Sequence, residues 1–166
     1  MTTTQEEKYN TEHIEYDALD LLPMGRLHTQ LGAHALGDCT GKTALDLGGG
    51  SGLHARTAVD QGAVRVDVVD LSSGMMENGI KNEARLGRKD RVRWYEADIS
   101  KSLEKLPLDD GYDIVMVNWT FDHAESVAAL EAMWDNVSKY TKSGGKLISI
   151  RMTSKYCACL VRRCLY

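Results

Sequence analysis

The chain has 166 residues, 43% of them hydrophobic, and 20 Lys and Arg residues against 24 Asp and Glu residues give a formal net charge of −4. This length and composition suit one domain with a buried core and exclude a disordered linker protein. Because there is no basic excess, we expect no nucleic-acid partner. No apolar run approaches the roughly 20 residues of a membrane span, and the first residues lack a signal-peptide layout, so we expect a cytoplasmic protein with no membrane partner.

The first 40 residues are predicted to be a helical segment. Apolar residues recur at helical spacing over 14–36, and Pro23 and Gly25 are expected to divide this stretch into two short helices. A run at 43–47 then predicts a strand that leads into a glycine-rich loop at 48–52.

After this loop, predicted strands alternate with predicted helices. The strands are expected at 43–47, 64–70, 91–95, 112–118 and 146–151, and the helices at 53–61, 73–86 and 124–140. Strands that alternate with helices of this length indicate a parallel sheet with right-handed crossovers. The predicted fold class is therefore α/β, a doubly wound, mainly parallel sheet.

The glycine loop and the next strand end suggest a nucleotide-like ligand. Ligands of an open parallel sheet bind at the carboxyl ends of the strands, where glycines allow close approach. Gly48, Gly50 and Gly52 precede a helix N-terminus, and Asp70 ends the second predicted strand, where a carboxylate accepts from ribose hydroxyls. The alternative is a tight structural turn followed by a surface aspartate.

The spacing of the glycines argues against a dinucleotide. The dinucleotide fingerprint G-x-G-x-x-G would need a third glycine where the chain has Leu53. The loop instead reads Asp-x-Gly-x-Gly-x-Gly from Asp46 to Gly52, which resembles motif I of the class I S-adenosylmethionine-dependent methyltransferases. Segments 70–76, 96–99, 112–118 and 143–147 are similar to later motifs of that family, in the same order. Within the family, the chain looks most like small-molecule enzymes of the ubiquinone-biosynthesis type.

The resemblance implies S-adenosyl-L-methionine as cofactor and assigns residues to each part of it. Asp46 and the loop glycines Gly48, Gly50 and Gly52 would hold the methionine end. Asp70 would accept from the ribose hydroxyls, and Leu71 would pack on the adenine. Acceptors in these places suit the ammonium and hydroxyl donors of the cofactor.

The resemblance also assigns residues beyond the first two strands. Asp98 would accept from the adenine amino group while Ile99 covers the adenine face. Asn118 would line the path between cofactor and acceptor, and Tyr16 would lie in an N-terminal segment that folds over the cofactor.

Catalysis is expected to rest on positioning, with help from one histidine. Methyl transfer from a sulfonium is an in-line displacement, and holding the reactants close supplies much of the acceleration. His123, preceded by Asp122, follows the fourth predicted strand and could take a proton from the acceptor. The alternative is a helix-start histidine with Asp122 as the cap. A magnesium site at Asn118 and Asp122 is disfavoured because hard cations need several converging oxygen ligands, so no metal is expected.

The resemblance weakens after the fifth predicted strand. Members of the family continue with a helix and a two-strand hairpin, whereas here only residues 152–166 follow a cofactor-binding domain at 41–151. That tail is expected to be a helix start cut short, which would leave strand five with an unpaired edge, so we expect a homo-oligomer or a partner that completes the sheet.

Three functions fit the sequence. The first is a methyltransferase with a small-molecule acceptor. The second is a cofactor-binding but inactive domain that acts through a partner chain. The third, a nicotinamide oxidoreductase, is disfavoured by the missing third glycine.

Overall fold

The computed structural model of the chain describes residues 22–88, 90–152 and 157–163. Its helices are α2 (Pro23–Leu36), α3 (Leu53–Asp60), α4 (Ser73–Arg85) and α5 (Val127–Tyr140), with the short 3-10 helix η1 (Thr120–His123) before α5. Its strands are β1 (Thr43–Leu47), β2 (Arg65–Asp70), β3 (Val92–Glu96), β4 (Tyr112–Met116), β5 (Thr141–Met152) and β6 (Cys157–Arg163).

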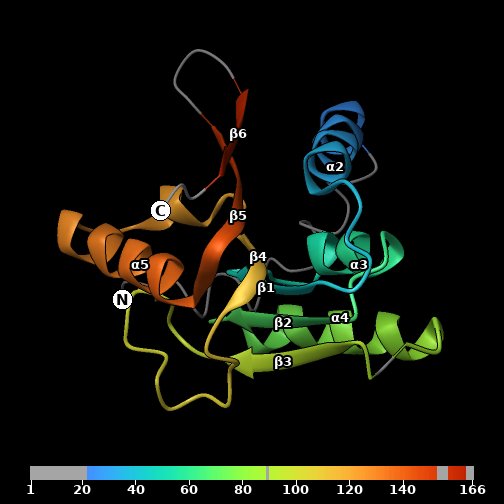
Figure 1. Ribbon diagram of the computed structural model, residues 1–166, viewed down its shortest axis with the longest axis horizontal. Helices are drawn as coiled ribbons and strands as arrows, with labels where there is room; N and C mark the ends of the chain where they lie inside the picture. Colours follow the sequence, from blue (N-terminus) through green and yellow to red (C-terminus); the bar gives the residue numbers. More distant parts are fainter. Residues whose placement is uncertain (1–21, 89, 153–156, 164–166) are drawn as a thin grey trace, which may run out of the picture.

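The six strands form one sheet in the order β3-β2-β1-β4-β5-β6 (Figure 1). The first five strands are parallel, and β6 runs antiparallel to β5. The predicted α/β, doubly wound, mainly parallel sheet is confirmed. The chain runs outward from β1 through β2 to β3 and then crosses back to β4 on the other side of β1. The strand order therefore reverses between β1 and β4, and ligands of such sheets bind at this point.

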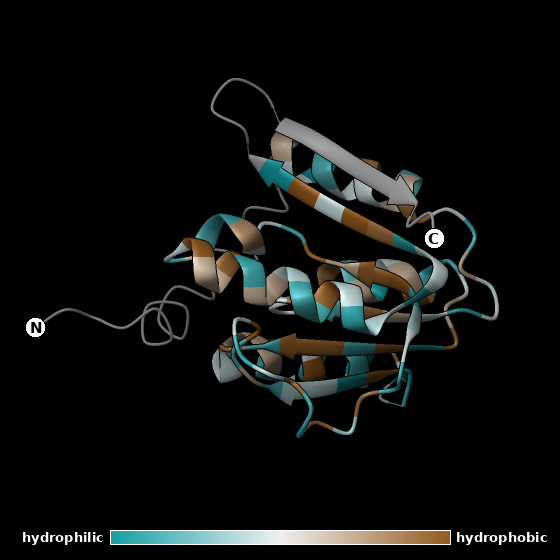
Figure 2. Cartoon of the chain, turned by 60° about the vertical axis from the view of Figure 1, so that its left-hand side comes forward, coloured by the Kyte–Doolittle hydropathy of each residue, from teal (hydrophilic) through white to brown (hydrophobic). Residues whose placement is uncertain are grey.

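Helices cover both faces of the sheet. On one face, Leu36 of α2 and Ala55 of α3 belong to a buried cluster with the inward residues of the strands. On the other face, Met133 and Val137 of α5 belong to a second cluster. Figure 1 shows α5 on one side of β4 and β5 and the pair α2 and α3 on the other. In Figure 2 the central strands are largely brown, as expected for strands buried on both faces.

The helix boundaries differ from the prediction in two places. Pro23 does not separate two helices but opens α2, where its missing N–H costs nothing, and Gly25 lies inside the same helix. The preceding stretch lies outside the described residues. Helix α5 begins at Val127, three residues later than predicted, because the chain is extended at Ala124 after η1 and Ser126 caps α5 by accepting from the Ala129 N–H at 3.1 Å.

The expectation of a helix start after strand five is wrong. Strand β5 is longer than predicted, and β6 pairs with it from Lys146 opposite Arg163 to Met152 opposite Cys157. The bare edge of β5 would offer a row of unpaired N–H and C=O groups, and the returning chain satisfies them. The expected unpaired edge of strand five is therefore covered within the chain, by one strand rather than by a hairpin of two.

Candidate cofactor site at the glycine loop

The site lies where β1 ends and α3 begins. Gly48, Gly50 and Gly52 all adopt positive φ values, of 73°, 53° and 77°, which other residues reach only with strain. The Gly48 N–H donates to the Val69 carbonyl at 2.7 Å, and the Gly52 N–H donates to the Gly49 carbonyl at 2.8 Å. The loop is therefore a tight turn anchored to the end of β2.

Side chains from other elements fill the space beside all three of these glycines. A Cβ on Gly48 would lie 2.3 Å from Cγ2 of Thr120, and a Cβ on Gly50 would lie 2.6 Å from Cε of Met75. The sequence assigned these glycines to the close approach of a ligand. The structure gives them a second reason, since any side chain there would collide with the protein itself.

Asp46 is a buried carboxylate directly beneath the loop. Its side chain is 1% exposed, and neither oxygen has a hydrogen-bond partner in the described part of the chain. A Cβ on Gly49 would lie 2.8 Å from Asp46 Oδ2. Burial, joined by the negative charge of Asp70, raises the pKa of Asp46 to about 7. The nearby Ala55 N–H, which lies outside hydrogen-bond geometry, and the Arg56 charge act in the opposite direction. A buried acceptor without a partner is costly, and a donor from a ligand would satisfy it.

Asp70 holds the loop from the end of β2. Its Oδ2 accepts from the Gly50 N–H at 2.7 Å, and its Oδ1 accepts from the Ser72 N–H at 2.8 Å. Burial raises the pKa of Asp70, and hydrogen bonds from backbone N–H groups, including that of Leu71, lower it. The structure brings Asp46, Asp70 and the three glycines together, as the sequence predicted. Leu71, the residue after Asp70, is half-buried.

The segment after β3 turns sharply at Asp98. Asp98 Oδ1 accepts from the Ser100 N–H at 2.8 Å and from its hydroxyl at 2.6 Å. Ile99 is 6% exposed and packs in the core cluster under α5, and its carbonyl accepts from Asn136 Nδ2 at 2.9 Å. The predicted contacts of Asp98 and Ile99 with the adenine remain predictions.

Asn118 has a structural use that the sequence did not indicate. Its side chain is 6% exposed, and its Oδ1 accepts from the Ile150 N–H of β5 at 2.9 Å. Trp119 follows with φ 66°, the one positive value at a non-glycine residue in the described ranges, and its N–H donates to the Ile150 carbonyl at 2.7 Å. The next side chain, Thr120, has its hydroxyl 3.2 Å from the Leu47 carbonyl. These contacts fix the chain after β4 to both β5 and the glycine loop.

The two predicted catalytic residues lie at the end of η1. Asp122 Oδ1 accepts from Arg151 Nε at 3.1 Å and from Nη2 at 2.9 Å. The alternative role of Asp122 as cap of the next helix is wrong, because Ser126 caps α5. His123 is exposed at the C-terminal end of η1, and its catalytic role remains a prediction. Tyr16 lies outside the described residues.

His54, near the start of α3, packs toward α2. It lies half-buried between α3 and α2, with Nδ1 3.3 Å from where a Cβ on Gly32 would be. Burial, together with the charges of His28 and Arg56, lowers the pKa of His54 to about 4. His28 of α2 packs edge-on against Trp119 with ring centroids 4.8 Å apart. Helix α2 is thereby joined to the segment after β4.

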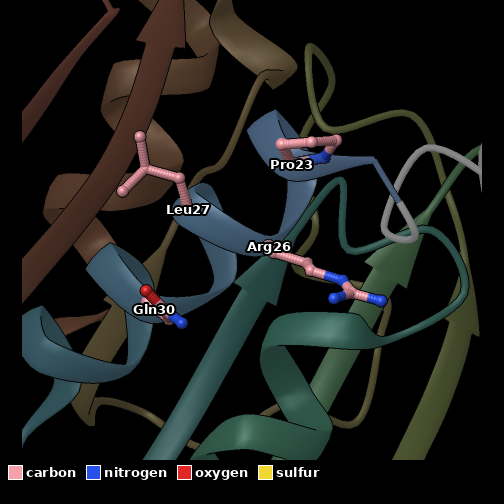
Figure 3. Close-up of a pocket in the computed structure, with 4 residues that line it drawn as sticks. All are labelled: Pro23, Arg26, Leu27 and Gln30. Carbon is pink, nitrogen blue, oxygen red and sulfur yellow. The ribbon is translucent and has the colours of Figure 1, made fainter.

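A hollow of about 330 Å³ lies on α2, lined by Pro23, Arg26, Leu27 and Gln30 (Figure 3). None of the predicted site residues lines it. In the described ranges no three His, Cys, Asp or Glu side chains converge as a metal site would require. No described helix has both the length and the apolar character needed to cross a bilayer.

Comparison with known proteins defines the class. The sequence profile of the family described as "Methyltransferase domain" matches residues 44–145, more than half of the chain, and the chain belongs to this family. The match runs from β1 into the first residues of β5 and includes the glycine loop, Asp70 and Asp98.

Individual proteins that resemble this chain share a third or less of its aligned residues. An uncharacterised protein of Haemophilus influenzae is 33% identical over 91 residues, which cover 54% of this chain and 35% of that protein. A structure from Methanococcus maripaludis, assigned as an S-adenosyl-L-methionine-dependent methyltransferase, is 20% identical with a TM-score of 0.71, covering 90% of this chain and 66% of that one. The structure described as a DhpI-SAM-HEP complex is 23% identical with a TM-score of 0.69, covering 92% and 69%. The chain thus spans about a third of the curated relative and about two thirds of these solved structures.

Proposed function

We propose that this chain binds S-adenosyl-L-methionine at the glycine loop and transfers its methyl group to a small-molecule acceptor. The observation that carries the proposal is the buried, unpartnered carboxylate of Asp46 under a glycine loop at the carboxyl end of β1. Membership of the methyltransferase domain family and the DhpI complex, whose description names SAM, support the same ligand.

The chain's acceptors match the donors of such a ligand. Asp46 would accept from the ammonium group, which would also draw its pKa down from about 7 by supplying a positive charge. Asp70 would accept from the ribose hydroxyls with the lone pairs left beside the backbone hydrogen bonds it already accepts. Asp98, Leu71 and Ile99 would surround the adenine, and the N-terminal segment with Tyr16 would cover the site.

The reaction would need little beyond positioning. The bound group supplies an electrophilic methyl on sulfur, and the protein would hold the acceptor in line with it. His123 would take a proton where the acceptor must lose one, and the ion pair between Asp122 and Arg151 would keep η1 against β5.

The cofactor assignment predicts a clear binding difference. We expect the chain to bind S-adenosylhomocysteine at micromolar concentrations and not NAD, measured by isothermal titration calorimetry. Asp70→Ala should weaken binding at least tenfold, because each lost charge-assisted hydrogen bond costs about 1.5–3 kcal/mol. Asp135→Ala, on the exposed surface of α5, is the matched control and should bind like the unaltered chain. Unchanged affinity in a folded Asp70→Ala variant would remove Asp70 from the site.

The acid–base role predicts a separate effect on rate. With an acceptor that must lose a proton, His123→Ala should lower turnover by roughly 10²–10⁴-fold. Its affinity for S-adenosylhomocysteine should stay the same. Near-full turnover in this variant, measured over a panel of acceptors, would leave positioning as the sole contribution of the protein.

A second candidate is a domain that binds the cofactor without turnover and acts through a partner chain or a second copy. It is favoured by the ion pair that Asp122, one of the two predicted catalytic residues, makes with Arg151 of β5. Cofactor binding without methyl transfer to any acceptor would support this candidate, whereas turnover would exclude it.

A further inference from the structure

The indole of Trp94 lies in a slot between the glycine loop and α4. A Cβ on Gly52, at the end of the loop, would lie 2.5 Å from Cη2 of Trp94, and a Cβ on Gly79 of α4 would lie 2.2 Å from the same atom. Trp94 comes from β3, which is separated from β1 by β2. The two glycines therefore make room for one ring that reaches the loop from a distant strand.

The same slot holds the carbonyl of Ser51. A Cβ on Gly79 would lie 2.7 Å from the Ser51 carbonyl oxygen, so α4 contacts the loop backbone directly. Arg56 Nη1 of α3 donates to this oxygen at 2.5 Å. Helices α3 and α4 and strand β3 thus meet at the last two residues of the loop.

Gly79 is an unfavourable residue for its local position. It lies in the interior of α4 and is buried, where alanine would favour the helix far more than glycine does. The structure explains the glycine by the contacts it permits, because a methyl group there would strike both the indole and the loop carbonyl. Glycine at this position makes α4 less stable as a helix, and it allows α4 to pack closely against the glycine loop.

We propose that Trp94, admitted by Gly79, is a positioning residue that holds the glycine loop in its ligand-ready shape. This inference rests on the proposed function, since the loop is the proposed cofactor site. Holding the loop in place before binding removes the entropic cost of ordering it when the ligand arrives. Trp94 acts on the loop through Gly52, while α4 reaches the Ser51 carbonyl at Gly79, and no contact between the ring and the ligand is required.

The test compares Trp94→Phe, Gly79→Ala and the double variant with the unaltered chain. Trp94→Phe removes the ring carbon that touches both glycines, and we expect S-adenosylhomocysteine to bind about five- to tenfold more weakly, measured by calorimetry. Gly79→Ala should also weaken binding, although alanine favours the helix. The double variant should lose less than the two single losses together, because the smaller ring leaves space for the methyl group. Trp134→Phe, a half-exposed tryptophan on α5, is the matched control and should bind normally.

Amide hydrogen exchange supplies a readout that needs no ligand. The N–H groups of Gly50 and Gly52 are hydrogen-bonded to Asp70 and to Gly49, and we expect faster exchange at both in Trp94→Phe while the amides of α5 keep their protection. Unaltered exchange and affinity in a folded Trp94→Phe variant would overturn the inference. If the unaltered chain binds no S-adenosylhomocysteine, the proposed function fails, and exchange at the loop alone decides whether Trp94 holds it.

Discussion

At the scale of single residues, Asp46 of the proposed cofactor site is unfavourable for the stability of the ligand-free fold. Its carboxyl group is buried, has no hydrogen-bond partner in the described ranges and lies near the charge of Asp70. A carboxyl whose pKa is raised in the folded state favours the protonated form. Its contribution to stability is therefore full below its unfolded pKa near 4 and is lost as the pH rises through about 7.

We therefore expect Asp46→Asn to stabilise the ligand-free chain at pH 8 and to change it little at pH 5. One pKa unit corresponds to about 1.4 kcal/mol, and after relaxation of the site a gain of about 1–3 kcal/mol in the free energy of unfolding is expected at pH 8. Urea denaturation at both pH values measures it. The same variant should bind S-adenosylhomocysteine more weakly, because the amide carries no charge for the ammonium group. An equal effect at pH 5 and pH 8 would show that Asp46 does not titrate in this range.

At the scale of secondary-structure elements, β2, β3 and β4 are tied by one buried carboxylate. Asp67 of β2 is fully buried, accepts from Arg93 Nε of β3 at 2.6 Å and accepts from the Tyr112 hydroxyl of β4. The Tyr112 oxygen in turn accepts from the Asp109 N–H at 3.0 Å. Burial and the bond to Asp67 raise the pKa of the Tyr112 hydroxyl, so it remains a donor.

Removing that hydroxyl should loosen the central strands. Tyr112→Phe leaves the Asp67 carboxylate and the Asp109 N–H each without one partner, and we expect a loss of about 1–3 kcal/mol in the free energy of unfolding. Urea denaturation measures this loss. Tyr140→Phe is the control, because that ring is buried on the same face and the described residues show it no hydrogen bond. Equal effects in the two variants would mean that the ring, and not the hydroxyl, matters.

At the scale of the whole molecule, the edge of the sheet lies at β6 rather than at β5. The sequence predicted association through an unpaired strand five, but β6 covers that strand. A variant ending at Met152 should recover the bare edge, and we expect it to associate and to melt at a lower temperature than the full chain. Light scattering and thermal unfolding test this, with a variant ending at Arg163 as the control that keeps β6. A monomeric variant ending at Met152 with an unaltered melting temperature would show that β6 does not protect the sheet.

The sequence by itself determined the order of the main strands and helices from β1 to β5 and the location of the loop. Strand and helix periodicities are local, a glycine triplet at a strand end is local, and the carboxyl ends of parallel strands meet wherever such a sheet forms. Asp46, Gly48 and Asp70 could therefore be placed together in advance.

Tertiary structure decided what surrounds these residues. Thr120 beside Gly48, Trp94 between Gly52 and Gly79, and the return of β6 along β5 join residues far apart in the chain. No periodicity predicts such contacts, because they depend on the shapes of side chains that meet only when the sheet and its helices pack together. The pKa of Asp46 follows from the same packing, since burial is its largest cause.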